Sequence, residues 1–103
     1  MHDENTPGNH EVYFKRCQAY LLLGSGDLAL RDVCKCLQLN EVWLEAHVAK
    51  SKILLKLGDV SECIAACNTG LAYYASNQDL QVTLDQAVSV LKNNAYLFIS
   101  TNF

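Results

Sequence analysis

The segment YFKRCQAYLLLG, residues 13–24, shares its pattern of apolar, small and turn residues with HVAKSKILLKLG, residues 47–58. The two segments are offset by 34 residues, so that Leu23-Gly24 falls on Leu57-Gly58. Glycine is favoured just past the end of a helix, so each segment is expected to end a helix at the same point of a repeat. The sequence therefore predicts two copies of one structural unit.

Apolar residues on both sides of the first glycine turn recur at helical spacing. One stripe precedes the turn and another follows it: Tyr13, Cys17, Tyr20 and Leu21, then Leu30, Val33, Cys36 and Leu37. A third helix is expected from Val42 to Leu57, and a fourth after Gly58. The residues after position 78 form a further stripe, which is Leu80, Leu84, Ala87, Val88, Leu91 and Ala95. Strand-type alternation does not persist anywhere, so an all-α fold is predicted.

Polar residues at the start of each apolar stripe are expected to cap the helices. Asp27 is expected to cap the second helix, and Asp59 the fourth, with Glu62 as its capping-box partner. The stretch from Ser76 to Asp79 is expected to form the turn and cap before the last helix.

These signals divide the chain into three parts. We expect a flexible N-terminal arm over residues 1–9, a helical repeat domain over 10–97 and an apolar tail over 98–103. The domain would contain a repeat over 10–43, a repeat over 44–77 and a capping helix over 78–97.

Composition excludes several classes of protein. The chain has 103 residues and a net charge of −3, with no basic stripe, so no nucleic-acid partner is expected. Its apolar runs are too short to cross a membrane, and no signal peptide is visible, so no membrane partner is expected. Five cysteines without a secretory signal indicate reduced thiols and a cytoplasmic location.

The repeat resembles the tetratricopeptide family, whose unit is a 34-residue helical hairpin. That family places an aromatic, a small and an aromatic residue where this chain has Tyr13, Cys17 and Tyr20. It also places small residues in its second helix, here supplied by two pairs of equivalent positions, Ala29 with Cys63 and Cys36 with Gly70. The chain departs from the pattern at four positions: Arg16 and Lys50 replace leucine, and Glu41 and Ala75 replace a closing proline.

The resemblance implies a scaffold that binds a protein or peptide partner along a concave groove, with no catalytic residues, no metal and no cofactor. The first helix of each repeat would line this groove. Its expected residues are Glu11, Phe14, Lys15, Gln18, Glu45, Val48, Ala49, Lys52 and Asp79. Apolar anchors are expected at Phe14, Val48 and Leu55.

Two stretches resemble the second and third repeats of co-chaperones that bind the C-terminal carboxylate of heat-shock proteins. They are residues 13–20 and residues 43–50. Carried onto this chain, the Asn, Lys and Arg of that clamp become Lys15, Glu45 and Ala49. Since one cation is lost and another becomes an anion, we expect no binding of acidic C-terminal tails.

An acidic column is formed instead by Glu11, Glu45 and Asp79, which occupy equivalent positions. A solvated helix face explains this column as well as a functional groove does. If the column is functional, it favours a ligand with Lys or Arg spaced along an extended segment.

A thiol-based metal site or redox sensor is the competing hypothesis, built on Cys34, Cys36, Cys63 and Cys67, with His47 as an extra ligand. Structural zinc sites usually join their cysteine pairs by turns, whereas both of these pairs lie inside expected helices. Buried packing of small thiols, and of His47 between helices, is the simpler interpretation.

Two repeats are few, because stacked repeats bury their faces on neighbours. The chain could thus be a fragment or short isoform of a larger co-chaperone or ubiquitin-ligase-associated protein. Residues 45–50 also resemble repeats of proteins that join a RING finger to a Lon-type N-terminal domain. The apolar tail needs cover, either by folding back, by covering the place of a preceding repeat, or by a homodimer through the C-terminal helix and tail.

Overall fold

In the computed structural model, the backbone is described for residues 9–102 and the side chains for residues 9–95. This part of the chain contains five α helices and no strand, which confirms the all-α prediction. The helices are α1 (His10–Leu22), α2 (Gly26–Leu39), α3 (Leu44–Lys56), α4 (Val60–Tyr73) and α5 (Gln78–Asn102). Most of the expected arm and the side chains of the expected tail lie outside the described residues.

A register of 34 residues runs through all five helices. α1, α3 and α5 begin at residues 10, 44 and 78, and α2 and α4 begin at residues 26 and 60. The turn hydrogen bonds keep the same spacing, because the N–H groups of Ser25 and Asp59 donate to the carbonyls of Tyr20 and Leu54. α5 therefore occupies the place of the first helix of a third repeat.

The two turn glycines explain where the hairpins reverse. Gly24 has φ 75° and Gly58 has φ 82°, and no other described residue has a positive φ. Side chains with a Cβ disfavour this conformation. The register places Lys92 at the equivalent position of the third repeat, and α5 does not turn there but continues to Asn102. The helix thus runs past the expected boundary at residue 97.

The helix caps correct three sequence expectations. Ser25, not Asp27, occupies the cap position of α2, because the helix already begins at Gly26. Asp59 does occupy the cap position of α4, but its side chain makes no capping hydrogen bond. α3 begins at Leu44, slightly later than the expected start at Val42. Asn77 caps α5, accepting a hydrogen bond of 2.9 Å from the N–H of Leu80.

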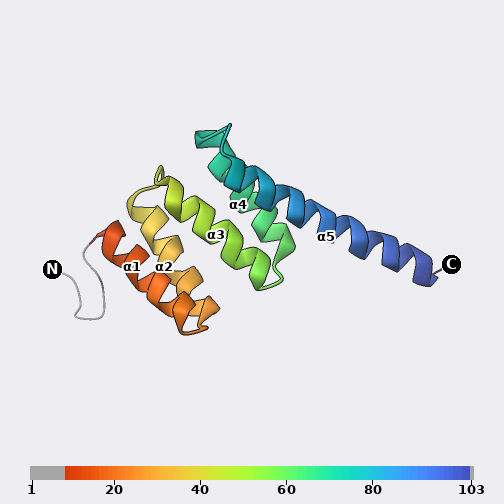
Figure 1. Ribbon diagram of the computed structural model, residues 1–103, viewed down its shortest axis with the longest axis horizontal. Helices are drawn as coiled ribbons and strands as arrows, with labels where there is room; N and C mark the ends of the chain where they lie inside the picture. Colours follow the sequence, from red (N-terminus) through yellow and green to blue (C-terminus); the bar gives the residue numbers. More distant parts are fainter. Residues whose placement is uncertain (1–8, 103) are drawn as a thin grey trace.

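Neighbouring helices pack in chain order, α1 on α2, α2 on α3, α3 on α4 and α4 on α5, while α3 also contacts α5 (Figure 1). Small buried residues lie where the helices pack together. They are Cys17, Ala29, Cys36, Ala46, Cys63, Ala66 and Cys67. Three helices approach closely at Gly70 of α4, where a Cβ atom would lie 2.8 Å from Cδ1 of Leu80 and 3.1 Å from Cβ of His47. Small side chains are needed here because helix axes in contact lie only about 8–10 Å apart.

Candidate functional site

Two adjoining hollows lie along α1, α3 and the start of α5. The first, of about 390 Å³, is lined by Phe14, Leu44, Glu45, Val48, Ala49, Asn77 and Asp79. The second, of about 330 Å³, is lined by Phe14, Cys17, Gln18, Leu21, Ala49, Lys52, Ile53 and Lys56. Phe14 and Ala49 line both hollows, so the two lie side by side, and we call the pair the groove.

The structure gathers most of the residues expected from the sequence into this groove. Those that line it are Phe14, Gln18, Glu45, Val48, Ala49, Lys52 and Asp79. Glu11 and Lys15 are exposed on α1 and line neither hollow. Leu55, expected as an apolar anchor, lies half-buried against the core cluster around Leu54 and Cys63 instead.

An aromatic cluster borders the groove beside Phe14, and the sequence patterns did not single it out. The Trp43 ring lies 4.9 Å from that of Phe14 and 4.8 Å from that of His10, centroid to centroid. His10 is held in turn by the Asn40 side-chain amide, 3.2 Å from its Nε2. Trp43 directly precedes α3. It is the single tryptophan of the chain, and this was the one sequence feature that could have pointed to the cluster.

The acidic column is not uniform in the folded chain. The Asp79 carboxylate lies 3.8 Å from Nζ of Lys52, so this pair spans α3 and α5 within the groove. Glu11 lies outside the groove, 4.0 Å from the imidazole of His10. Among the described residues, no cationic group lies within ion-pair distance of Glu45. Glu45 is therefore the groove carboxylate that is open to a cation from a partner.

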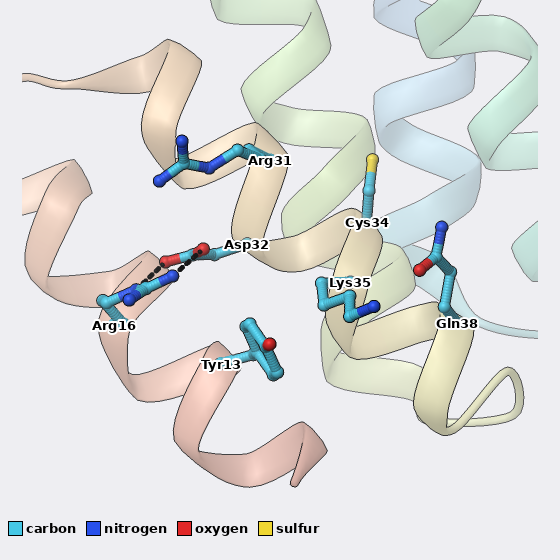
Figure 2. Close-up of a pocket in the computed structure, with 7 residues that line it drawn as sticks. All are labelled: Tyr13, Arg16, Arg31, Asp32, Cys34, Lys35 and Gln38. Carbon is cyan, nitrogen blue, oxygen red and sulfur yellow. Dashed lines mark hydrogen bonds and ion pairs between the residues drawn. The ribbon is translucent and has the colours of Figure 1, made fainter. Parts of the chain in front are cut away.

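A third hollow, of about 500 Å³, lies on the first hairpin and is lined by Tyr13, Arg16, Arg31, Asp32, Cys34, Lys35 and Gln38 (Figure 2). The Arg16 guanidinium donates two hydrogen bonds to the Asp32 carboxylate, at 2.7 and 2.8 Å. The carboxylate of Asp32 raises the pKa of Arg16. Because Arg16 and Asp32 in this hollow already pair with each other, we place the candidate site in the groove instead.

The cysteines take part in packing. Cys17, Cys36, Cys63 and Cys67 are buried, and Cys34 is half-buried. Burial raises the pKa of the Cys17, Cys36 and Cys63 thiols to about 11 in each case. Burial also raises the pKa of the Cys67 thiol. Protonated, buried thiols are poor nucleophiles and poor metal ligands. Within the part of the chain that the structure describes, no three Cys, His, Asp or Glu residues are grouped as a metal site.

His47 lies between the helices. It is 4% exposed, and its Nε2 is 2.7 Å from the backbone carbonyl of Glu41. A carbonyl can only accept, so Nε2 carries the proton. The imidazole also packs 5.5 Å from the ring of Tyr73. These contacts assign His47 a packing role at the α3–α4 interface.

Helical hairpins in a 34-residue register, with small residues at their crossings, are the arrangement typical of tetratricopeptide repeats. No protein-family model matches the chain. Over 59 residues, 57% of this chain, it is 37% identical to the tetratricopeptide repeat and J domain-containing co-chaperone DNJ1 of Cryptococcus neoformans. Over 81 residues, 79% of the chain, it is 32% identical to the Hsp70-Hsp90 organizing protein of Triticum aestivum. The resemblance to co-chaperone tetratricopeptide repeats is confirmed.

A third relative has a different domain in its name. The chain is 25% identical over 89 residues to U-box domain-containing protein 70 of Oryza sativa. The chain spans only 11% to 14% of the length of the curated relatives it matches. Among the described helices, none combines the length and the apolar character needed to span a membrane.

Proposed function

We propose that this chain is a protein-interaction module whose groove holds an extended segment of a partner protein. The observation that supports this proposal most is the groove itself, which lies along the first helices of two consecutive repeats and reaches the start of α5. Its floor combines the apolar side chains of Phe14, Val48 and Ala49 with charged groups at both ends. A few placed polar groups beside an apolar floor are what fix the orientation of a bound segment.

The charges along the groove define the partner's chemistry. Glu45 stands at one end, Lys52 is paired with Asp79 between the two hollows, and Lys56 lines the other end. Glu45 and Lys56 are eleven residues apart on α3, which corresponds to about 16 Å along the helix axis. An extended peptide covers about 3.3 Å per residue, so about five residues bridge this distance. The fitting ligand thus has a Lys or Arg at one end, apolar residues between and an acidic residue at the other.

Binding of designed peptides tests this proposal. A peptide with a lysine, four apolar or small residues and a glutamate is compared with the same composition in scrambled order, using fluorescence anisotropy. Glu45→Lys should weaken the ordered peptide about tenfold or more, because the charge contact becomes repulsive. Glu62→Lys, an equal change at an exposed site on α4, should leave affinity unchanged. Equal binding by the Glu45 and Glu62 variants would contradict the proposal.

The same groove is proposed not to accept acidic C-terminal tails. In place of the clamp cations it presents the Glu45 carboxylate and the short side chain of Ala49, while Lys15 lies outside it. A titration of an acidic C-terminal peptide followed by calorimetry should therefore show negligible heat. Micromolar binding of that peptide would overturn this part of the proposal.

A further inference from the structure

Among the described helices, none covers α5 in the way that α4 covers the equivalent helix α3. In the second repeat, Ala46 and Ile53 of α3 pack into the core cluster of the first hairpin. The opposite side of α3 packs on α4: Leu54 joins the cluster of Cys63 and Cys67, and the Cys63 thiol donates to the carbonyl of Ser51. A first helix in this array is therefore covered on two sides.

The described part of α5 is covered on one side only. Leu80, Thr83 and Ala87 are buried. The register matches His47, Ser51 and Leu54 of α3, which are all buried, to Gln81, Asp85 and Val88 of α5, a face that we call the open face. Gln81 and Asp85 are exposed and Val88 is half-buried. No described helix packs on the open face in the way that α4 packs on α3.

The second half of α5 extends beyond the other four helices, toward the end marked C (Figure 1). Its 25 residues correspond to about 37 Å, against about 20 Å for the 13 residues of α3. Leu91 is 48% exposed, and Tyr96-Leu97-Phe98-Ile99 follow it on helical backbone. Most of the stability of a protein helix comes from packing, so a partner surface would stabilise this extension.

We propose that a second copy of α5, running antiparallel, covers the open face. Asp85 and Lys92 are seven residues apart, nearly two helical turns, so they lie on the same side of α5. If a two-fold axis passes between Val88 and Ser89, Asp85 of each copy lies opposite Lys92 of the other. A two-fold interface requires such self-complementarity. The second copy takes the position of the missing second helix of the third repeat.

This arrangement favours a second copy over an unrelated partner, because Asp85 and Lys92 of one α5 are complementary to Lys92 and Asp85 of an antiparallel copy. It also places the two repeat bodies at opposite ends of the paired helices, since the buried residues of α5, which are Leu80, Thr83 and Ala87, lie in its first half. The groove is not needed for this contact, so the proposal is independent of the proposed function.

Sedimentation velocity over low to high micromolar concentrations tests the proposal, with two single variants of the full chain. Asp85→Lys carries two lysines on the open face and Lys92→Asp carries two aspartates, so each variant alone should be monomeric. An equimolar mixture of the two should form a dimer again, because both opposing pairs are then of opposite sign. The double variant Asp85→Lys/Lys92→Asp should also dimerise, and Glu62→Lys should behave as the unmodified chain.

Both substituted residues are exposed, and circular dichroism should confirm unchanged folding of each variant. Three results would overturn the proposal: a monomeric unmodified chain at high micromolar concentration, dimers of both single variants, or a mixture that stays monomeric. The last two would place any association elsewhere on the molecule.

Discussion

Asp32 is the residue whose environment is most unusual for its type. Its side chain is 1% exposed, and Arg16 supplies both of its charge-assisted hydrogen bonds. The Arg16 guanidinium also lies 5.7 Å from the Tyr13 ring and 5.8 Å from the Tyr20 ring. In the second repeat the register puts Lys50 and Ala66 at the positions of Arg16 and Asp32. The first hairpin thus uses an ion pair where the second uses a small apolar residue.

Arg16→Leu should destabilise the chain by about 3–5 kcal/mol in urea unfolding, because it leaves the Asp32 carboxylate buried without its cation. The double variant Arg16→Leu/Asp32→Ala should recover most of that loss, since no buried charge remains. Lys50→Leu, the matched change in the second repeat, should alter stability by no more than about 1 kcal/mol. A double variant as unstable as Arg16→Leu would show that the ion pair is not the cause.

The buried thiols predict a loss of stability at alkaline pH. Burial raises the pKa of Cys17 and Cys63 to about 11 from the usual 9.0. Between these values the unfolded chain releases its thiol protons while the folded chain retains them, so stability falls as pH rises. Urea unfolding in reductant from pH 8 upward should show this fall. Cys17→Ala should reduce its slope, whereas Cys34→Ala, at a half-buried site, should not; equal slopes would contradict the interpretation.

At the scale of the elements, the position of one glycine decides whether a helix turns or continues. Gly24 and Gly58 end the first helices of two repeats with positive φ. Both have open space where a Cβ atom would lie, so their role is conformational and not steric. Lys92 occupies the third such position, and there the helix goes on. The third repeat position therefore lacks the residue that favours the reversal of the chain in the first two.

Gly58→Ala should cost about 1–2 kcal/mol, since alanine must adopt a left-handed conformation in the turn. Gly58→Asn should cost less, because asparagine tolerates this region better. Thermal unfolding of both variants beside the unmodified chain measures the difference. An asparagine variant no more stable than the alanine variant would indicate that the cost arises from contacts of the turn.

At the scale of the whole molecule, α5 couples the third repeat position to the second hairpin. Leu80 is fully buried and lies against Gly70 of α4, and Ala87 joins the cluster of Leu54, Cys63 and Cys67. Stability in stacked repeats is carried by such nearest-neighbour contacts. The first half of α5 is therefore part of the folded unit, while residues 91–95 of its second half are exposed.

Leu80→Ala should reduce the free energy of unfolding by about 2–5 kcal/mol, because it leaves a cavity at the α4–α5 contact. Val82→Ala, at a side chain that is 53% exposed, should cost less than about 1 kcal/mol. Urea unfolding followed by circular dichroism compares the two. Similar midpoints for both variants would mean that α5 does not stabilise the body.

Much of the fold was predictable because repeat signals are local and recur. The Leu-Gly pairs, the small residues and the helical stripes each appear twice at the same spacing, so they predict the hairpins and their register. Boundaries were less predictable: the cap of α2 depends on the conformation of the turn before it, not on the nearest acidic side chain. The groove residues were predicted only through the resemblance, and Glu11, Lys15 and Leu55 do not line it.

The sequence by itself determined the helical class, the period of 34 and the reversal points, because backbone preference and hydrophobic spacing are written locally along the chain. Only the tertiary structure decided which charges meet. The pairing of Arg16 with Asp32, of Lys52 with Asp79, and the isolation of Glu45 depend on how helices far apart in sequence are placed beside one another. The same packing decided that α5 keeps one face open, since a missing neighbour is visible only in three dimensions.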